Sequence, residues 1–221
     1  MKKVNKIRVL IWVLALSPLV IIAILYSSLP ELIPMHWGAG GNVRYDPKVN
    51  IWWLAGMSPA LAALFMLLPK IDPRRQNYEK FRGFYDGFCL FFMIFLHGIV
   101  GIILSESFFP GRLRIDFVVV AACGVLFVFL GNMLPKVKSN FFMGIRTPWT
   151  LSNSVVWNKT HRLAGFLWFF GGFLIIALSF FARDTALFVI FLIIIAIITL
   201  IPVVMSYIWY QKLPKTDGNI E

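Results

Sequence analysis

The stretch ALFVIFLIIIAIITLIPVVMSYIWY, residues 186–210, decides the fold because none of its side chains carries a charge. As an α-helix rising 1.5 Å per residue, it is longer than the roughly 30 Å hydrocarbon core of a bilayer. The composition of the whole chain agrees: of its 221 residues, 59% are hydrophobic and only 14% are charged. A soluble domain carries about 25% charged residues. The sequence therefore predicts an integral membrane protein.

Five further uncharged runs have the length of a membrane span, at residues 9–29, 51–69, 88–104, 117–134 and 163–182. Because a helix satisfies its own backbone hydrogen bonds in lipid, each run is predicted to be a transmembrane helix. The first run is longer than the ~7–15 apolar residues of a cleavable signal peptide. It also has Leu25 or Tyr26 where cleavage needs a small residue, so we expect it to be retained. The predicted fold class is an all-α membrane protein, a bundle of six transmembrane helices.

The distribution of basic residues predicts the orientation of this bundle. With the N-terminus inside, 16 of the 21 Lys and Arg residues fall on the inner side, and five fall outside. The outer five are Arg44, Lys48, Arg112, Arg114 and Arg183. Such an excess on one side is typical of the cytoplasmic side. We therefore expect a multi-pass protein of the bacterial cytoplasmic (inner) membrane with both ends in the cytoplasm. Its basic residues would contact lipid headgroups, so the net charge of +11 requires no direct nucleic-acid partner.

The spans and loops suggest two parts. Residues 1–87 are expected to form an N-terminal transmembrane hairpin whose loop, 30–50, lies outside. Residues 88–221 are expected to form a four-helix membrane domain whose longest loop, 135–162, lies in the cytoplasm.

Two local signals concern helix contacts and helix ends. Gly56 and Ala60 have the small-xxx-small spacing that allows close helix packing. The short turn at 183–185 requires the fifth and sixth spans to be antiparallel, and Asp184 is expected to cap the sixth helix.

The side-chain chemistry gives no support for an enzyme or a metal site. His36 is predicted outside, His97 inside the third span and His161 in the cytoplasm, so no single ion could bind all three. HExxH and GxSxG motifs are absent from the sequence. Cys89 and Cys123 lie in apolar runs without CxxC spacing, as buried thiols do. We expect no catalytic residue, no cofactor and no metal. His97 is either a proton or ligand contact or a histidine bonded to a freed backbone carbonyl.

The predicted cytoplasmic loop, 135–162, holds the densest set of polar and aromatic residues. Ser152 or Ser154 could cap a helix that carries Trp157, His161 and Ala164 on one face. One interpretation is a short interfacial helix with tryptophans at headgroup level and basic residues on phosphates. The other interpretation is a binding site for a ligand or partner.

The run GNMLPKVKSNFFMGIRTPWTLSNSVVWNKTHRLAG, residues 131–165, resembles the signature of the SdpI family of membrane immunity proteins. The residues in pattern are Gly131, Asn132, Asn140, Gly144 to Trp149, Trp157, His161 and Arg162. In residues 30–50, Pro34-Met35-His36-Trp37 and Gly40-Gly41 are similar to an N-terminal domain of unknown function that is often fused to this signature. Trp37 stands where that domain usually has Phe.

The resemblance implies a non-enzymatic immunity or toxin-response protein that protects against a secreted antimicrobial peptide toxin. It also implies, more weakly, signalling by recruitment of a cytoplasmic transcriptional repressor to the membrane. The implied ligand- or partner-binding residues in the motif loop are Asn132, Asn140, Gly144, Arg146, Thr147, Pro148, Trp149, Trp157, His161 and Arg162. Those outside are His36, Gly40 and Gly41. Two alternatives stay open: a small-molecule or peptide transporter, and a membrane enzyme acting on lipid-linked substrates.

Overall fold

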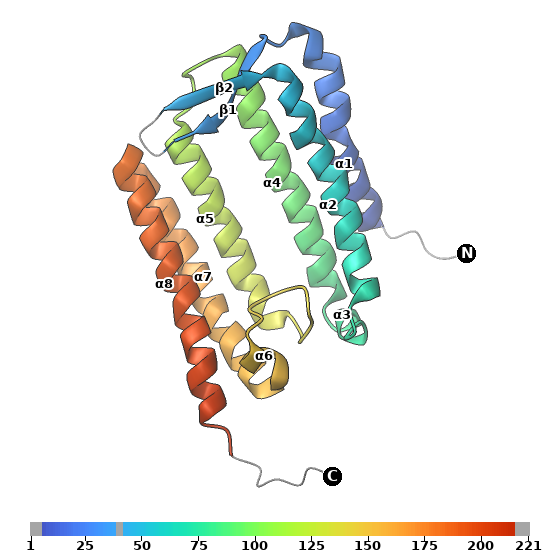
Figure 1. Cartoon of the computed structure of the whole chain (residues 1–221), viewed down its shortest axis with the longest axis vertical. Helices are drawn as coiled ribbons and strands as arrows, with labels where there is room; N and C mark the ends of the chain where they lie inside the picture. Colours follow the sequence, from blue (N-terminus) through green and yellow to red (C-terminus); the bar gives the residue numbers. More distant parts are fainter. Residues whose placement is uncertain (1–5, 39–41, 215–221) are drawn as a thin grey trace, which may run out of the picture.

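The computed structural model describes residues 6–38 and 42–214, and it shows a bundle of long helices with a β-hairpin across one end (Figure 1). The long helices are α1 (Lys6–Leu25), α2 (Ile51–Ile71), α4 (Arg82–Phe108), α5 (Ile115–Met133), α7 (Ser154–Phe181) and α8 (Asp184–Gln211). The short elements are η1 (Tyr26–Ser28), β1 (Leu32–Trp37), β2 (Val43–Pro47), η2 (Lys48–Asn50), α3 (Gln76–Glu79), η3 (Leu134–Lys136) and α6 (Pro148–Ser152). We call the end with β1 and β2 the hairpin end, and the end with α3 and α6 the motif end.

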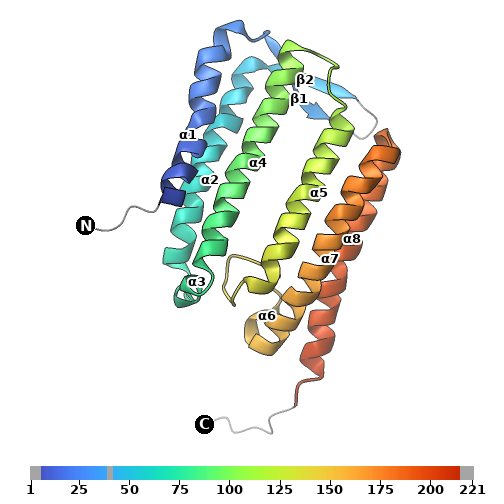
Figure 2. The ribbon, with the colours of Figure 1, turned by 180° about the vertical axis from the view of Figure 1, so that it is seen from behind.

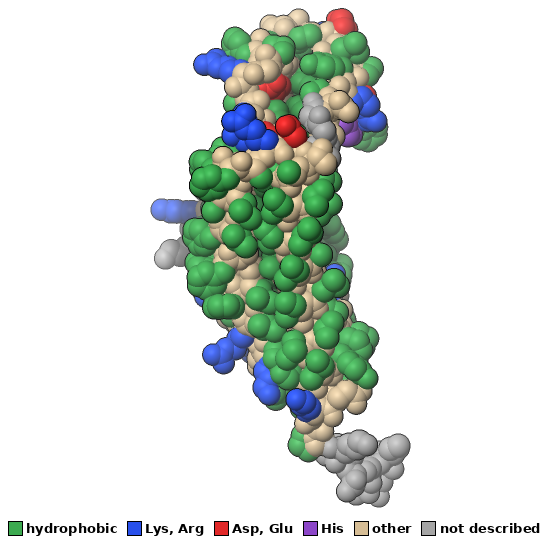
Figure 3. Space-filling view, turned by 90° about the vertical axis from the view of Figure 1, so that its left-hand side faces the viewer, with side chains coloured by type: hydrophobic (Ala, Val, Ile, Leu, Met, Phe, Trp, Pro, Cys, Tyr) green, Lys and Arg blue, Asp and Glu red, His purple; other side chains and the backbone are tan. Residues whose placement is uncertain are grey.

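The six predicted spans are all helical in the structure. Each of the six long helices is long and apolar enough to cross a membrane. Large apolar side chains on their outer faces stay exposed, including Ile24 at 72% and Leu200 at 59%, as is expected of surfaces that face lipid. Figure 3 shows a continuous hydrophobic band between the two ends, with most charged side chains above and below it.

The six helices form two groups of three (Figures 1 and 2). Helix α4 packs mainly on α1 and α2, whereas α7 packs on both α5 and α8. The predicted boundary between the two parts, at residue 88, falls inside α4. Because α4 packs mainly on α1 and α2, the third span lies with the first two. Between the groups, the rings of Phe91 and Phe129 stack with their centroids 4.0 Å apart.

Pro18 inside α1 explains the surroundings of His97. Pro18 has no backbone N–H, so the carbonyl of Leu14 loses its helical partner. The hydroxyl of Ser17 bonds to that carbonyl at 3.0 Å, and its oxygen also lies 2.6 Å from Nε2 of His97. Nδ1 of His97 lies 2.8 Å from the carbonyl oxygen of Met93. These contacts favour the structural interpretation of His97, with Ser17 rather than His97 bonded to the freed carbonyl.

Glycines hold α5 and α7 in close contact. Gly124 and Gly131 on α5 face Gly172 and Gly165 on α7, each pair seven residues apart along its helix. A Cβ on Gly172 would lie 2.6 Å from the carbonyl oxygen of Gly124, and one on Gly131 would overlap the backbone of Phe169. Only glycine permits this approach, as in other membrane helix pairs.

Two local predictions are wrong. A Cβ on Gly56 would have open space around it, so Gly56 does not lie at a close helix contact. Asp184 does not cap α8: Arg183 is the N-cap residue, without a side-chain cap bond. Asp184 lies in the first turn with a φ of 49°, and its N–H donates to Oδ2 of Asp116 at 3.3 Å.

The expected outer loop contains an antiparallel β-hairpin, so the fold is not wholly α-helical. Leu32 pairs with Pro47, and His36 pairs with Arg44. Ile33 is fully buried in a cluster with residues of α1, α2 and α4, which fixes the hairpin on the bundle. The glycine-rich run at 38–41 connects the two strands, and Gly40 and Gly41 lie outside the described residues.

Candidate functional site

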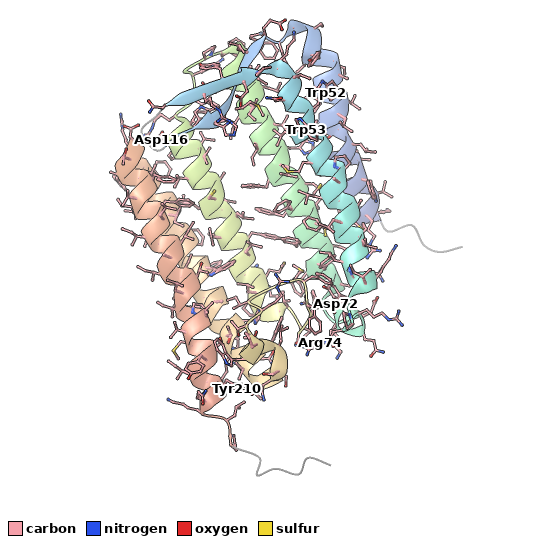
Figure 4. All side chains as sticks on the ribbon, viewed as in Figure 1. Trp52, Trp53, Asp72, Arg74, Asp116 and Tyr210 are labelled. Atoms are coloured by element: carbon pink, nitrogen blue, oxygen red, sulfur yellow. The ribbon has the colours of Figure 1, made fainter. Side chains whose placement is uncertain are left out.

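The loop between α5 and α7, residues 134–153, folds back against the turn between α2 and α4 at the motif end. Figure 4 shows Asp72 and Arg74 of that turn beside this loop. Val137, Met143 and Trp157 share a buried cluster with residues of α1, α2 and α4. The motif loop therefore joins the two helix groups.

Asn140 and Asp72 form the centre of this junction. Oδ1 of Asn140 accepts the backbone N–H groups of Phe142 at 2.9 Å and Met143 at 2.6 Å, and the side chain is fully buried. Asp72 is 2% exposed, and its Oδ2 accepts the N–H of Phe141 at 2.9 Å. A buried polar group is stable only when it is hydrogen-bonded, and both side chains meet that condition across the junction.

Tyr78 links these two acceptors. Its hydroxyl lies 3.1 Å from Oδ2 of Asp72 and 3.2 Å from Oδ1 of Asn140. The pKa of Tyr78 is raised, first by burial and then by the charge of Asp72 and the hydrogen bond to it. The positive charge of Arg146 acts in the opposite direction. Tyr78 therefore serves as a neutral hydrogen-bond donor.

Arg74 and Asn77 hold the same loop from the side. The guanidinium of Arg74 donates to the hydroxyl of Ser139 and, at 2.8 Å, to the carbonyl oxygen of Leu151. The amide of Asn77 donates to the carbonyl oxygen of Ser139 at 2.8 Å. These contacts, one to a hydroxyl and two to backbone carbonyls, fix the path of the loop.

His161 and Trp157 form the second anchor of the loop. The two rings stack with centroids 4.0 Å apart, and both side chains are 1% exposed. Nε1 of Trp157 donates to the carbonyl oxygen of Val137 at 2.9 Å. Nδ1 of His161 lies 2.8 Å from the carbonyl oxygen of Trp157, and Nε2 accepts the N–H of Ile145 at 3.0 Å. Both ring nitrogens of His161 are thus occupied by the backbone, with the proton on Nδ1.

The Thr-Pro-Trp run starts helix α6. Thr147 and Thr150 form a reciprocal capping box, with Pro148 in the first turn, where its missing N–H needs no partner. Oγ1 of Thr147 also lies 3.1 Å from Oγ of Ser206 on α8. The ring of Trp149 packs on Tyr207 of α8 at 5.0 Å between centroids. This run therefore docks the loop on the last helix.

The predicted interfacial helix is not a separate helix. Trp157, His161 and Ala164 lie on one helix face, as predicted, and all three are buried. They belong to the continuous helix α7. Its cap is Asn153, whose Oδ1 accepts the N–H groups of Val155 at 2.8 Å and Val156 at 3.1 Å. The predicted caps, Ser152 and Ser154, are each one residue away from the observed cap.

Five motif residues are exposed at this end: Asn132, Gly144, Arg146, Pro148 and Arg162. Nζ of Lys136 donates to Oδ1 of Asn132 at 3.3 Å, and Arg162 is exposed on α7. Nη1 of Arg146 donates to the carbonyl oxygen of Phe141 at 2.6 Å, and the rest of this exposed side chain faces outward. A guanidinium presented on a fixed loop is suited to a carboxylate or phosphate group.

The residues predicted to act outside lie at the other end of the bundle. Nδ1 of His36 is 3.1 Å from Oδ2 of Asp46 and 2.9 Å from Nη2 of Arg44. His36 is therefore part of a local cluster on the hairpin, far from His97 in α4 and His161 in α7. No group of three His, Cys, Asp or Glu side chains suited to a metal ion occurs within residues 6–38 and 42–214.

The sequence did not single out the partners of the motif loop in the α2–α4 turn. Asp72, Arg74, Asn77 and Tyr78 lie more than sixty residues before the groups that they bind. One signal was available: Asp72 sits in a short, polar turn, where a side chain that satisfies backbone N–H groups is common.

Comparison with known proteins finds a family match that covers most of the motif loop and the helices after it. The model of the SdpI/YfhL protein family matches residues 136–206, which run from the end of η3 into α8. We call residues 136–206 the SdpI/YfhL region. The SdpI/YfhL region contains every singled-out motif residue except Asn132, and it lacks the first group of helices. The resemblance inferred from the sequence is confirmed.

Two further findings extend the comparison beyond the SdpI/YfhL region. The Domain of unknown function (DUF1648) matches residues 13–58, which include β1 and β2. The chain is 27% identical over 190 residues to the Immunity protein SdpI of Bacillus subtilis (strain 168), covering 86% of this chain and 89% of that protein. Together with the six apolar helices, this similarity identifies a multi-pass membrane protein. No solved structure matches the chain.

Proposed function

We propose that this protein is a membrane immunity protein that protects its cell against a secreted antimicrobial peptide toxin. The observation that carries the proposal is the similarity to Immunity protein SdpI along most of both chains. The distribution of contacts in the motif loop supports a non-enzymatic role: the imidazole of His161 and the amide of Asn140 are both occupied by the backbone. Neither group is available as an acid, a base or a nucleophile.

The proposed orientation places the motif end and both termini on the cytoplasmic side of the membrane, and the hairpin end outside. The loops that carry most Lys and Arg residues all lie at the motif end, which supports this assignment through the positive-inside rule. We further propose two units, the DUF1648-containing part and the SdpI/YfhL part, joined at the motif loop. The exposed Arg146 and Arg162 would then face cytoplasmic partners, either lipid phosphates or an acidic surface on a transcriptional repressor.

A toxin challenge tests the proposal. A strain that lacks this gene is exposed to the toxic peptides secreted by its own species, and survival is compared with the same strain carrying the gene on a plasmid. We expect the deletion strain to lose viability and the plasmid to restore it. Equal survival of both strains at verified protein abundance would refute an immunity function. Substrate flux in liposomes, measured on the purified protein, would instead support the transporter alternative.

A further inference from the structure

A cavity of about 460 Å³ opens at the hairpin end, between strands β1 and β2 and the first turns of α5 and α8. This volume lies within the range of small ligand sites, roughly 300–1,000 Å³. Figure 4 shows Asp116, at the start of α5, below the hairpin and beside the start of α8. The cavity is separate from the motif loop, which lies at the other end of the bundle.

One wall of this cavity is apolar. Val119 and Val120 of α5 and Leu187 and Phe188 of α8 line it. Val120 and Leu187 are buried, whereas Val119 and Phe188 are about two-fifths exposed, at 41% and 40%. Such a wall favours aliphatic or aromatic ligand groups.

The polar lining of the cavity has an excess of negative charge. Glu106, Asp116 and Asp184 line it, with Arg114 as the basic residue among the lining side chains. Both oxygens of Glu106 accept backbone N–H groups, from Gly111 at 2.8 Å and Leu113 at 2.9 Å. Figure 3 shows acidic side chains directly above the hydrophobic band on the face formed by α7 and α8. In a chain with a net charge of +11, this local excess is unusual.

Arg114 compensates only one of these carboxylates. Its Nη2 lies 3.6 Å from Oδ2 of Asp116, and the same oxygen accepts the N–H of Asp184. The carboxylate of Asp184 therefore provides a negative charge beside an apolar wall. This combination suits a cation attached to an apolar segment, and it opposes the phosphate of a phospholipid headgroup.

We propose that this cavity binds an apolar segment of a membrane-active peptide that carries a basic side chain, with the basic group at Asp184 and the apolar side chains against Val119 and Phe188. The assignment rests on the proposed function and names the site through which it acts. In the proposed orientation, the cavity opens toward the side from which a secreted peptide arrives, at the depth where an amphipathic peptide lies.

Binding of a defined probe tests this site directly. The probe is a short fluorescent peptide of Leu and Lys, and its matched control is the same peptide with Glu in place of Lys. Affinity is measured by fluorescence anisotropy on the full-length protein in phosphatidylcholine nanodiscs, with empty nanodiscs subtracted. We expect the Lys peptide to bind and the Glu peptide to bind at least tenfold more weakly. Equal affinity for the two peptides would overturn the proposal.

Three variants locate the site. Asp184→Asn keeps a side chain that tolerates the φ of 49° and removes the charge, so affinity should fall about three- to fivefold. Val119→Trp fills the cavity and should abolish detectable binding. Glu31→Gln alters an 88% exposed acid at the same end, outside the cavity, and should leave affinity unchanged. Unchanged affinity in both cavity variants, at normal melting temperature, would refute the site.

The same variants in the toxin challenge separate this proposal from the proposed function. If the deletion strain is not sensitised while the cavity variants still lose peptide binding, the immunity function fails and the site stands. If the gene protects and both cavity variants bind and protect normally, the site fails and the immunity function stands. If Val119→Trp reduces the amount of co-purified phospholipid and leaves peptide binding intact, the cavity is a lipid site and the proposal is refuted.

Discussion

Gly144 lies directly against the imidazole of His161, so close that a Cβ on Gly144 would overlap Nε2 of the ring. Gly144 also has a φ of 95°, in the left-handed region that residues with a side chain rarely adopt. The next N–H in the chain, that of Ile145, donates to the same Nε2. Glycine and histidine are therefore required together: the histidine fixes the direction of the loop, and the glycine allows the backbone to reach it.

Replacement of Gly144 by Ala should destabilise the protein strongly, by roughly 3–5 kcal/mol, because it combines a disfavoured φ with loss of the His161 bond. Gly111→Ala is the matched control. Its φ is 75°, but a Cβ there would meet open space, so about 1–2 kcal/mol is expected. Thermal unfolding of both purified variants in one detergent measures the difference. Equal shifts in melting temperature would show that the contact with His161 contributes nothing.

Arg146→Ala should abolish toxin protection while the protein stays folded and inserted. The side chain is exposed and donates a hydrogen bond to the carbonyl oxygen of Phe141, so its loss should change the free energy of unfolding by less than about 1 kcal/mol. Arg74→Ala is a contrasting variant, because Arg74 holds Ser139 and Leu151 and its loss should lower the melting temperature. Survival under toxin challenge and membrane abundance are measured together.

Trp149→Ala is expected to lose protection in the same assay, with a moderate loss of stability because Trp149 packs on Tyr207. Full protection by both Arg146→Ala and Trp149→Ala at normal abundance would mean that the motif loop only holds the two helix groups together. The ligand site would then lie elsewhere.

The orientation of the bundle can be tested with single cysteines and an impermeant thiol reagent in intact cells. Both native cysteines, Cys89 and Cys123, are first replaced by Ala. A cysteine in place of Asn42, exposed beside the hairpin, should be labelled, and one in place of the exposed Asn158 should be protected. Asn158 is preferable to Asn153, whose side chain caps α7. Labelling at 158 alone would reverse the proposed orientation.

The six helices could be predicted from the sequence because lipid imposes a simple requirement: an uncharged run of sufficient length must form a helix. Helix ends were harder to predict. Helix α7 begins at Ser154, nine residues before the apolar run at 163–182, because its first turns are held by the Asn153 cap and by burial of Trp157 rather than by lipid. Uncharged length carries no information about such turns.

The motif residues could be recognised in the sequence, but their roles could not. Asn140 and His161 looked suited to ligand binding, yet their polar atoms are occupied by the backbone. The partners of the loop, Asp72 and Tyr78, come from a distant turn, and no local pattern indicates a contact over such a separation. The β-hairpin was also missed, although two short apolar segments around a glycine-rich turn are a recognised hairpin signal.

Tyr78→Phe tests the junction between the two helix groups. The substitution removes the hydroxyl shared by Asp72 and Asn140, which should lower the free energy of unfolding by about 1 kcal/mol at neutral pH. Tyr210→Phe, near the end of α8 (Figure 4), is the control for loss of one phenol hydroxyl and should melt like the wild type.

The pH dependence of the Tyr78→Phe effect follows from the raised pKa of Tyr78. Above about pH 10, the unfolded chain releases the phenol proton of Tyr78 while the folded protein retains it. The folded state then binds more protons than the unfolded state, so the contribution of Tyr78 to stability is complete below about pH 10 and declines as the pH rises further. Tyr78→Phe lacks this proton, so its melting temperature should fall less than that of the wild type between about pH 9 and about pH 11. Parallel melting curves for the two proteins across this range would show that Tyr78 is not held as a neutral donor between Asp72 and Asn140.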